Sequence, residues 1–133
     1  MATANAYQTY KTQDISMASP MALIVMLYNG CIKRLKLARM AIEKKDFEDA
    51  NTQLKKARDI ISELINSLDF NYPIANDLMA LYEFMLREII QINITKDKER
   101  IEPVINMLSG LRDTWKQVEK TCRQSYPIEE SQA

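Results

Sequence analysis

The side chains with acid–base chemistry to offer include two close pairs of carboxylates, Asp46 with Asp49 and Glu129 with Glu130. A carboxyl group that acts as a general acid needs an apolar setting that raises its pKa. The first pair begins a helical pattern, where Asp46 can cap the helix and Asp49 suits its dipole. The second pair stands in a polar tail. These carboxylates therefore indicate capping and solvation rather than catalysis.

The two cysteines, Cys31 and Cys122, lie far apart and show no metal-ligand spacing. They are typical of small buried hydrophobic residues or free thiols in a reducing compartment. The chain has no histidine, which excludes Ser-His and Cys-His nucleophile pairs and the Glu-x-x-His ligands of di-iron bundles. No phosphate loop, nucleophile elbow or zinc motif occurs. We expect no enzyme activity, no catalytic residue, no metal and no cofactor.

The first carboxylate pair and the cysteines lie on predicted helices. Apolar residues recur with helical period along the chain, which has only two glycines and four prolines. The patterns predict four helices, at residues 20–44, 46–68, 74–93 and 98–122. Short connections between them favour an all-α, antiparallel four-helix bundle. We divide the chain into an N-terminal arm that is flexible or forms a short helix, the bundle, and a flexible tail, at residues 1–18, 19–123 and 124–133.

Composition and charge place this bundle among soluble proteins. The 133 residues make one domain, and 47% hydrophobic with 27% charged residues is a globular composition. Basic and acidic residues both number 18, so no basic excess attracts nucleic acid. The longest apolar run, Met21 to Tyr28, is too short to span a bilayer and lacks the position of a signal peptide. We expect a cytosolic protein that does not bind nucleic acid or insert into a membrane.

Local signals mark where the helices begin. Ser19 and Pro20 fit the cap and the first position of the first helix, and Asp46 fits the cap of the second. Asp97 can cap the fourth helix, but Pro103 would then lack a donor and clash inside it. Two starts for this helix stay open, at Asp97 or near Pro103.

The periodicity also predicts which residues face the core. The stripe of the first helix includes Leu27 and Tyr28, and leaves Val25 and Ile32 off the inward face. The stripes of the other three helices include Phe47, Ile74, Leu81 and Trp115. Trp115 is expected to be largely buried.

The first and third helices carry more apolar residues than one stripe needs, which is about three positions in seven. Leu23 and Met26 lie about 60 degrees or more off the inward stripe of the first helix. Eight methionines add flexible side chains that suit an adaptable binding surface. Two interpretations stay open, a large core or dimer interface and a binding surface. The candidate partner-binding residues are Tyr7, Tyr10, Leu23, Met26, Leu27, Met79, Leu86 and Ile90.

A set of short motifs in fixed order extends over residues 4 to 120. The motifs are Asn5-Ala6-Tyr7, Ala18-Ser19-Pro20, Met26-Leu27-Tyr28-Asn29-Gly30, Leu68-Asp69, Leu81-Tyr82, Asp97, and Leu108 to Trp115 with the sequence Leu-Ser-Gly-Leu-Arg-Asp-Thr-Trp. In this order they resemble the flagellar secretion chaperone FliS family, the export chaperones of flagellin. The chain departs from the family pattern at Pro103, at Gly110 and at Tyr72-Pro73.

The resemblance implies a chaperone that binds the C-terminal segment of flagellin as helices on its apolar surface. Such binding prevents premature polymerisation and keeps flagellin competent for flagellar type III export. The family delivers its cargo to the type III export gate as a complex, and we expect a monomer or weak homodimer. We also hypothesise that Tyr7 and Tyr10 hold the arm over part of the empty groove.

Two alternatives to a chaperone stay open. One is a small all-α dimeric enzyme, which would need buried Arg and Lys side chains converging on a dianionic ligand. The other is a helical dimerisation module without cargo.

Overall fold

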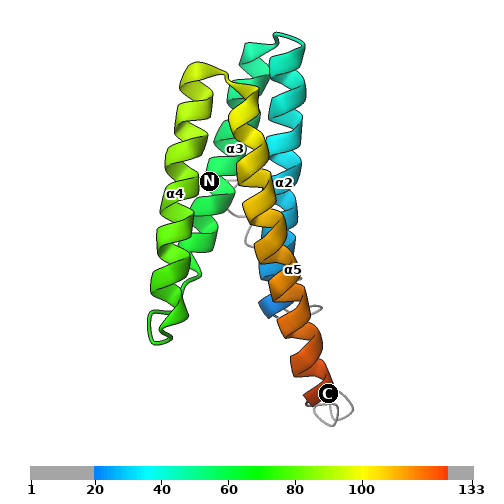
Figure 1. The fold of residues 1–133 in the computed structure, drawn as a ribbon, viewed down its shortest axis with the longest axis vertical. Coiled ribbons are helices and arrows are strands. Elements are labelled where there is room, and N and C mark those ends of the chain that lie inside the picture. Colours follow the sequence, from blue (N-terminus) through cyan, green and yellow to red (C-terminus); the bar gives the residue numbers. More distant parts are fainter. Residues whose placement is uncertain (1–19, 126–133) are drawn as a thin grey trace, which may run out of the picture.

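Four α-helices and a short 3-10 turn make up the structure, a computed structural model that describes residues 20–125 and side chains as far as Cys122. The elements are α2 (Pro20–Glu43), α3 (Phe47–Asn66), α4 (Ile74–Thr95), η1 (Lys98–Arg100) and α5 (Ile101–Ser125). Each helix runs antiparallel to the next one in sequence (Figure 1). The predicted all-α antiparallel four-helix bundle is confirmed. The arm at 1–18 lies outside the described residues.

Capping groups and left-handed residues explain where α3 begins and where α2 and α4 end. The side chain of Asp46 accepts a hydrogen bond of 3.1 Å from the backbone N–H of Asp49, as predicted for the cap of α3. Lys45 and Lys96 end α2 and α4 with left-handed backbones, at φ of 62° and 53°. The N–H of Asp46 donates back to the carbonyl of Ala41 at 2.8 Å, which makes the α2 end a Schellman motif.

The start of α5 decides between the two predicted starts of the fourth helix. Asp97 caps only η1, where its side chain accepts a hydrogen bond of 3.1 Å from the N–H of Glu99. The α-helix begins at Ile101. Pro103 therefore lies in the first turn of α5. A backbone N–H at that position has no acceptor within the helix, so a proline there costs no hydrogen bond. The later start, near Pro103, is correct.

The helices pack in the order α4, α3, α2, α5. α2 packs along both α3 and α5, and α4 packs along α3. In contrast, α4 and α5 make few contacts with each other. Figure 1 shows them joined at the top through η1 and diverging below. The bundle is thus closed on three seams and opens along the fourth.

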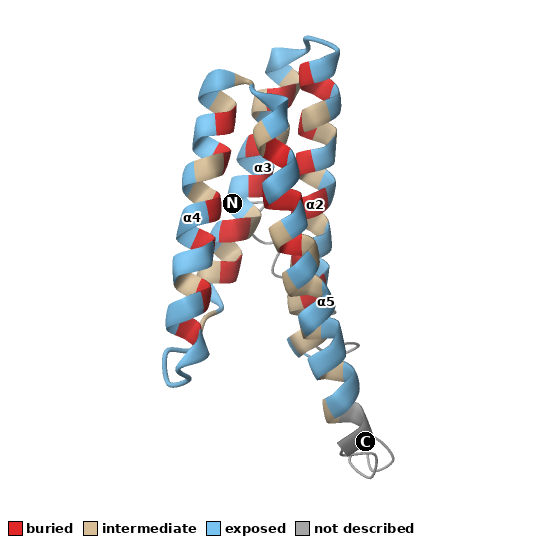
Figure 2. Ribbon diagram, viewed as in Figure 1, coloured by how far each residue is buried: buried red, intermediate tan, exposed pale blue. Residues whose placement is uncertain are grey.

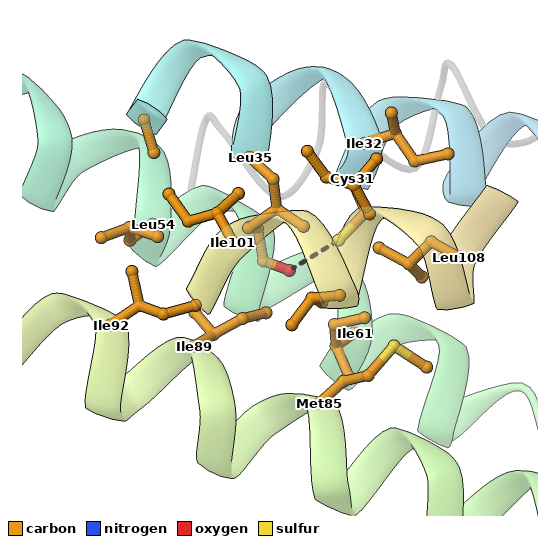
Figure 3. Packing of buried hydrophobic residues seen from close by; sticks show 14 of the residues in the cluster. Cys31, Ile32, Leu35, Leu54, Ile61, Met85, Ile89, Ile92, Ile101 and Leu108 are labelled. Carbon is orange, nitrogen blue, oxygen red and sulfur yellow. Dashed lines mark hydrogen bonds between the residues drawn. The ribbon is translucent and has the colours of Figure 1, made fainter. Parts of the chain in front are cut away.

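The core is apolar and draws on all four helices (Figure 3). Apart from the hydroxyls of Tyr28 and Tyr82 and the thiol of Cys31, no polar or charged side-chain group is buried among the described residues. In α5 the last buried residue of the described part is Leu108, and Figure 2 shows the lower half of this helix without buried residues. The largest buried side chains are those of Tyr28, Tyr82, Leu35, Leu54, Ile61, Leu64, Met85, Ile89, Ile92, Ile101, Leu108 and Val104.

The structure corrects the predicted inward stripes at the edges of the core. Val25 and Ile32 are buried, because α2 has a neighbour on two sides and its buried arc is wider than one stripe. Phe47 and Ile74 are 48% and 56% exposed, because each is the first residue of its helix.

Two further predicted core positions also differ, both on the seam that opens. Leu81 is 36% exposed and belongs to α4, which makes few contacts with α5. Trp115 packs against the core but is only partly buried, since it follows Leu108 into the diverging half of α5.

Candidate functional site

Three of the predicted binding residues lie on α2 beside α3. Leu23 and Leu27 are partly buried and lie one turn apart, and Met26 is 40% exposed. Leu27 lines a shallow hollow with Ile60, Asp59 and Glu63 of α3. One turn beyond Met26, a Cβ atom added to Gly30 would lie 3.5 Å from Cδ1 of Ile60. We name Leu23, Met26, Leu27, Gly30 and Ile60 the α2–α3 face.

The other three lie on the opposite side of α3. Met79 and Leu86 are partly buried and Ile90 is 40% exposed. Their spacing of seven and four residues places them on one flank of α4. Asn93 continues this flank and donates a hydrogen bond of 2.7 Å to Asn51 of α3, so the flank faces α3. We name Met79, Leu86 and Ile90 the α3–α4 face.

The structure therefore does not bring the predicted site residues into one groove. α3 lies between the two faces, and its outward side carries exposed charged residues such as Lys55 and Asp59. Tyr7 and Tyr10 lie outside the described residues. The candidate site on the described residues consists of two separate apolar surfaces.

A third apolar surface was missed by the sequence prediction. Leu81 shares its flank of α4 with Glu88, which forms an ion pair of 3.1 Å with Arg100, the last residue of η1 before α5 begins. This contact shows that the flank faces α5. The flank of α5 on that side carries apolar residues at helical spacing. We name Ile74, Leu81, Phe84, Leu111, Trp115 and Val118 the α4–α5 face.

A signal for this surface exists in the sequence, because Phe84 and Leu81 widen the apolar arc of α4. The periodicity of a sequence shows how wide the apolar arc of a helix is, but it does not show which neighbouring helix covers that arc. In the structure Phe84 is 41% and Val118 40% exposed, and the helices that carry them, α4 and α5, make few contacts with each other.

Beside the α4–α5 face lies an aromatic cluster formed by Tyr28, Tyr82 and Trp115. The hydroxyl oxygens of the two tyrosines are 2.5 Å apart and their ring centroids 6.5 Å apart. The indole N–H of Trp115 donates to the Tyr28 hydroxyl oxygen at 3.1 Å. Burial raises the pKa of both tyrosines, so both phenols are neutral at physiological pH. The cluster links α2, α4 and α5 by hydrogen bonds where α4 and α5 no longer pack together.

Charged groups border these apolar surfaces, and Asp59 and Glu63 line the hollow of the α2–α3 face itself. Arg39 pairs with Glu102, and Arg112 donates to Asn29 at 3.1 Å, so two polar contacts fasten α5 to α2. Among residues 20–125 no group of Cys, Asp and Glu is placed to hold a metal ion. Within the same residues no helix is long and apolar enough to cross a membrane.

An antiparallel helical bundle that leaves apolar residues on three flanks offers surfaces suited to protein binding. The comparison with protein families then identifies the family. The model of the family "Flagellar protein FliS" matches residues 3–122. The chain belongs to the FliS family.

Relatives with established names support this assignment over most of their length. The flagellar secretion chaperone FliS of Bacillus subtilis is 39% identical over 117 residues, which is 88% of each chain. That of Salmonella typhimurium is 34% identical over 125 residues, covering 89% of this chain and 93% of that protein. That of Campylobacter jejuni is 33% identical over 115 residues, covering 85% and 90%.

The fold has a solved counterpart. A crystal structure of a flagellar chaperone from bacteria matches with a TM-score of 0.74 and 21% identity, covering 89% of this chain and 98% of that one. At this identity the likeness confirms the fold alone. Family membership makes the protein a chaperone of flagellar export and not an enzyme, which removes the enzyme alternative.

Proposed function

We propose that this protein binds the C-terminal segment of flagellin, prevents its premature polymerisation and keeps it competent for flagellar type III export. Its relatives are named flagellar secretion chaperones. The observation that carries the proposal is the apolar surface left on three flanks of a bundle whose core is already filled. In this proposal the protein works in the cytosol as a monomer or weak homodimer and brings its cargo to the export gate.

The α2–α3 face has the form that an amphipathic helix needs. Such a helix places residues at every third or fourth position into an apolar groove. Leu27 and Ile60 line a hollow there, and Gly30 leaves room because it has no side chain. A guest helix can therefore lie close to the backbone of α2, with Met26 and Leu23 beside it.

The number of apolar surfaces suits a long and unstructured cargo. A segment that folds on binding loses conformational entropy, and this cost must be offset by extensive apolar contact. One face of a small bundle offers room for one helix. The α2–α3, α3–α4 and α4–α5 faces together let a segment of several helices wrap around the bundle.

The N-terminal arm has a place in this proposal, although it lies outside the described residues. Tyr7 and Tyr10 would cover part of the binding surface in the free protein and move when cargo binds. A ligand shifts such a balance only if it favours the displaced state. Deletion of residues 1 to 17 should leave the helical circular dichroism unchanged and alter cargo affinity. An unchanged affinity would remove the gating role of the arm.

Asp substitutions on the α2–α3 face test the proposal. Met26 is 40% exposed, so Met26→Asp should change the stability by no more than about 0.5 kcal/mol. Leu23 is partly buried, and Leu23→Asp should cost somewhat more. Both should sharply reduce capture of a flagellin C-terminal fragment, because the new carboxylate would be desolvated beneath the cargo helix.

Met40→Asp is the matched control, because Met40 is a methionine of the same helix with 48% exposure. It lies fourteen residues from Met26, or roughly 21 Å along the helix axis. Capture by this variant should stay close to wild type. If Met26→Asp and Leu23→Asp stay folded and still capture the fragment, the α2–α3 face is not the groove, and Ile90→Asp then tests the α3–α4 face. Failure of the wild-type protein to capture the fragment would contradict the proposed function itself.

A further inference from the structure

Most of the described methionines lie outside the buried core. The described positions that hold a methionine are Met21, Met26, Met40, Met79, Met85 and Met107. Among these only Met85 is buried, whereas methionine is in general one of the residues found most often inside proteins. Mild oxidants convert the thioether of an accessible methionine into a polar sulfoxide. The surface methionines therefore give this bundle a sensitivity to oxidation that leucines would not give it.

Met26 combines exposure with a place in the proposed binding site. It is 40% exposed and belongs to the α2–α3 face, one turn from Leu23 and one turn from Gly30. A guest helix that lies close to Gly30 would cover the Met26 side chain. Met40 is similarly accessible, at 48% exposure, but lies outside the three apolar faces. The two methionines should therefore be oxidised at similar rates, and only Met26 should matter for binding.

Hydrogen peroxide oxidises the Met26 thioether in a single two-electron step. The sulfur attacks one peroxide oxygen, the O–O bond breaks and a sulfur–oxygen bond forms. The second oxygen leaves as water after a proton transfer, so the peroxide is reduced while the sulfur is oxidised. Methionine sulfoxide reductases reverse the step with two electrons and two protons from a dithiol, which becomes a disulfide, and they release the oxygen as water.

The new oxygen would suit the free protein but not the complex. A sulfoxide oxygen accepts hydrogen bonds and donates none, and it would lose its water when a guest helix covers it. The polar side chains that line the neighbouring hollow are Asp59 and Glu63, whose ionised carboxylates also only accept. These carboxylates cannot replace the lost water. Oxidation should therefore oppose binding, while water hydrates the sulfoxide in the free protein and leaves the fold intact.

We propose that Met26 is a reversible oxidation site, and that its sulfoxide closes the α2–α3 face to the cargo helix. This inference rests on the proposed function, because the cargo is taken to be the C-terminal segment of flagellin. An oxidant of the peroxide class would weaken cargo binding without unfolding the protein, and a sulfoxide reductase would restore it.

The test treats the full-length protein with hydrogen peroxide and then removes the peroxide, so that the peptide added later is not oxidised. Dithiothreitol then restores thiols that have formed sulfenic acids or disulfides, at Cys31 or Cys122, and leaves the methionine sulfoxides in place. Mass spectrometry should find sulfoxides at Met26 and Met40 before it finds one at Met85.

Binding is measured by calorimetric titration with a peptide that spans the C-terminal segment of the flagellin from the same organism. The peroxide dose is set so that Met26 and Met40 are oxidised and the partly buried Met79 is not. The treated protein should bind the peptide about tenfold more weakly than the untreated protein. Its thermal melting should change little. Treatment with the two sulfoxide reductases, one for each sulfoxide epimer, should restore the affinity.

Two leucine substitutions assign the loss to one sulfur atom. Met26→Leu keeps an apolar side chain of similar volume but has no sulfur to oxidise. Its affinity should be close to wild type before treatment and should stay so after treatment. Met40→Leu is the matched control on the same helix, and its affinity should fall on treatment as that of the wild type does.

The outcomes separate this inference from the proposed function. If the untreated protein binds the peptide and still binds equally well with Met26 oxidised, the oxidation site has no effect and the proposed function stands. An equal loss of affinity in treated Met26→Leu would assign the effect to another residue, and a Met26 that resists a dose that oxidises Met40 would not be accessible; either result overturns the inference alone. If the untreated wild type does not bind the peptide, the proposed function fails and this inference fails with it.

Discussion

Replacement of Gly30 by alanine should make the protein more stable and a weaker binder at the same time. Gly30 lies in the interior of α2 and has no positive φ, so its backbone does not need glycine. Alanine in a helix interior is favoured over glycine by about 1 kcal/mol. The new methyl group would meet Cδ1 of Ile60 at 3.5 Å, an ordinary van der Waals contact. For a chain of this size the gain corresponds to a rise in melting temperature of about 3 to 5 °C.

The matched variant is Gly110→Ala. Gly110 lies inside α5, and a Cβ atom there would meet nothing within 4 Å. Its helix-propensity gain is the same, and because the two sites share no neighbours the gains should add to about 2 kcal/mol. Only Gly30→Ala adds a methyl group to the α2–α3 face, so only this variant should lose affinity for the flagellin segment.

Urea unfolding and peptide titration of the two single variants and the double variant measure these effects. A destabilising Gly30→Ala would show that Ile60 cannot yield, and that α2 and α3 are packed more tightly than the distance indicates. Equal affinity of both variants for the segment would show that no guest helix approaches α2 at Gly30.

Three further predictions concern stability and binding. Burial raises the pKa of Tyr28 and Tyr82, and that of Cys31 to about 12. In the unfolded chain these groups ionise near pH 9 to 10. Their ionisation should therefore not affect the free energy of unfolding below that range, and should lower it above that range by about 1.4 kcal/mol per pH unit for each group. The midpoint of urea unfolding measures this change. A flat alkaline limb would contradict their burial. Lys45→Gly should raise the stability by about 1 kcal/mol, since φ of 62° strains a lysine and not a glycine; a lower melting temperature would refute this. Capture of the flagellin segment should change little with added salt, because its contacts are apolar, and a steep loss would point to ionic binding.

The bounds of the helices could be predicted because the signals that set them are local. Asp46 caps α3 through its own side chain, and Pro103 restricts the start of α5 through its own ring. These effects involve residues a few positions apart, and a sequence shows such neighbours directly. All four helices were therefore predicted, with small differences at their ends.

The surfaces were harder to predict because they depend on which helices touch. Val25 is buried on a helix that packs against both α3 and α5, and Leu81 is exposed on a helix that makes few contacts with α5. Both residues have the same kind of apolar periodicity in the sequence. Likewise, Leu23 and Ile90 both stand out in the sequence as surplus apolar residues, and only the packing order shows that α3 separates them. The role of Tyr28 in the aromatic cluster also depends on residues more than fifty positions away.

The position of α2 between α3 and α5 has a consequence for synthesis on the ribosome. α2 and α3 are neighbours in sequence and can pair as soon as both have emerged. The sequence separations of the hydrogen bonds between α2 and α5 run from 63 to 87 positions, as between Arg39 and Glu102 or Tyr28 and Trp115. Contacts of such long sequence separation form late in folding. Until α5 emerges, the nascent chain exposes the side of α2 that holds Val25 and Ile32. During that interval the chaperone itself exposes an apolar side of α2. Hydrogen exchange on stalled nascent chains would detect this as amides of α2 that become protected only after α5 has emerged.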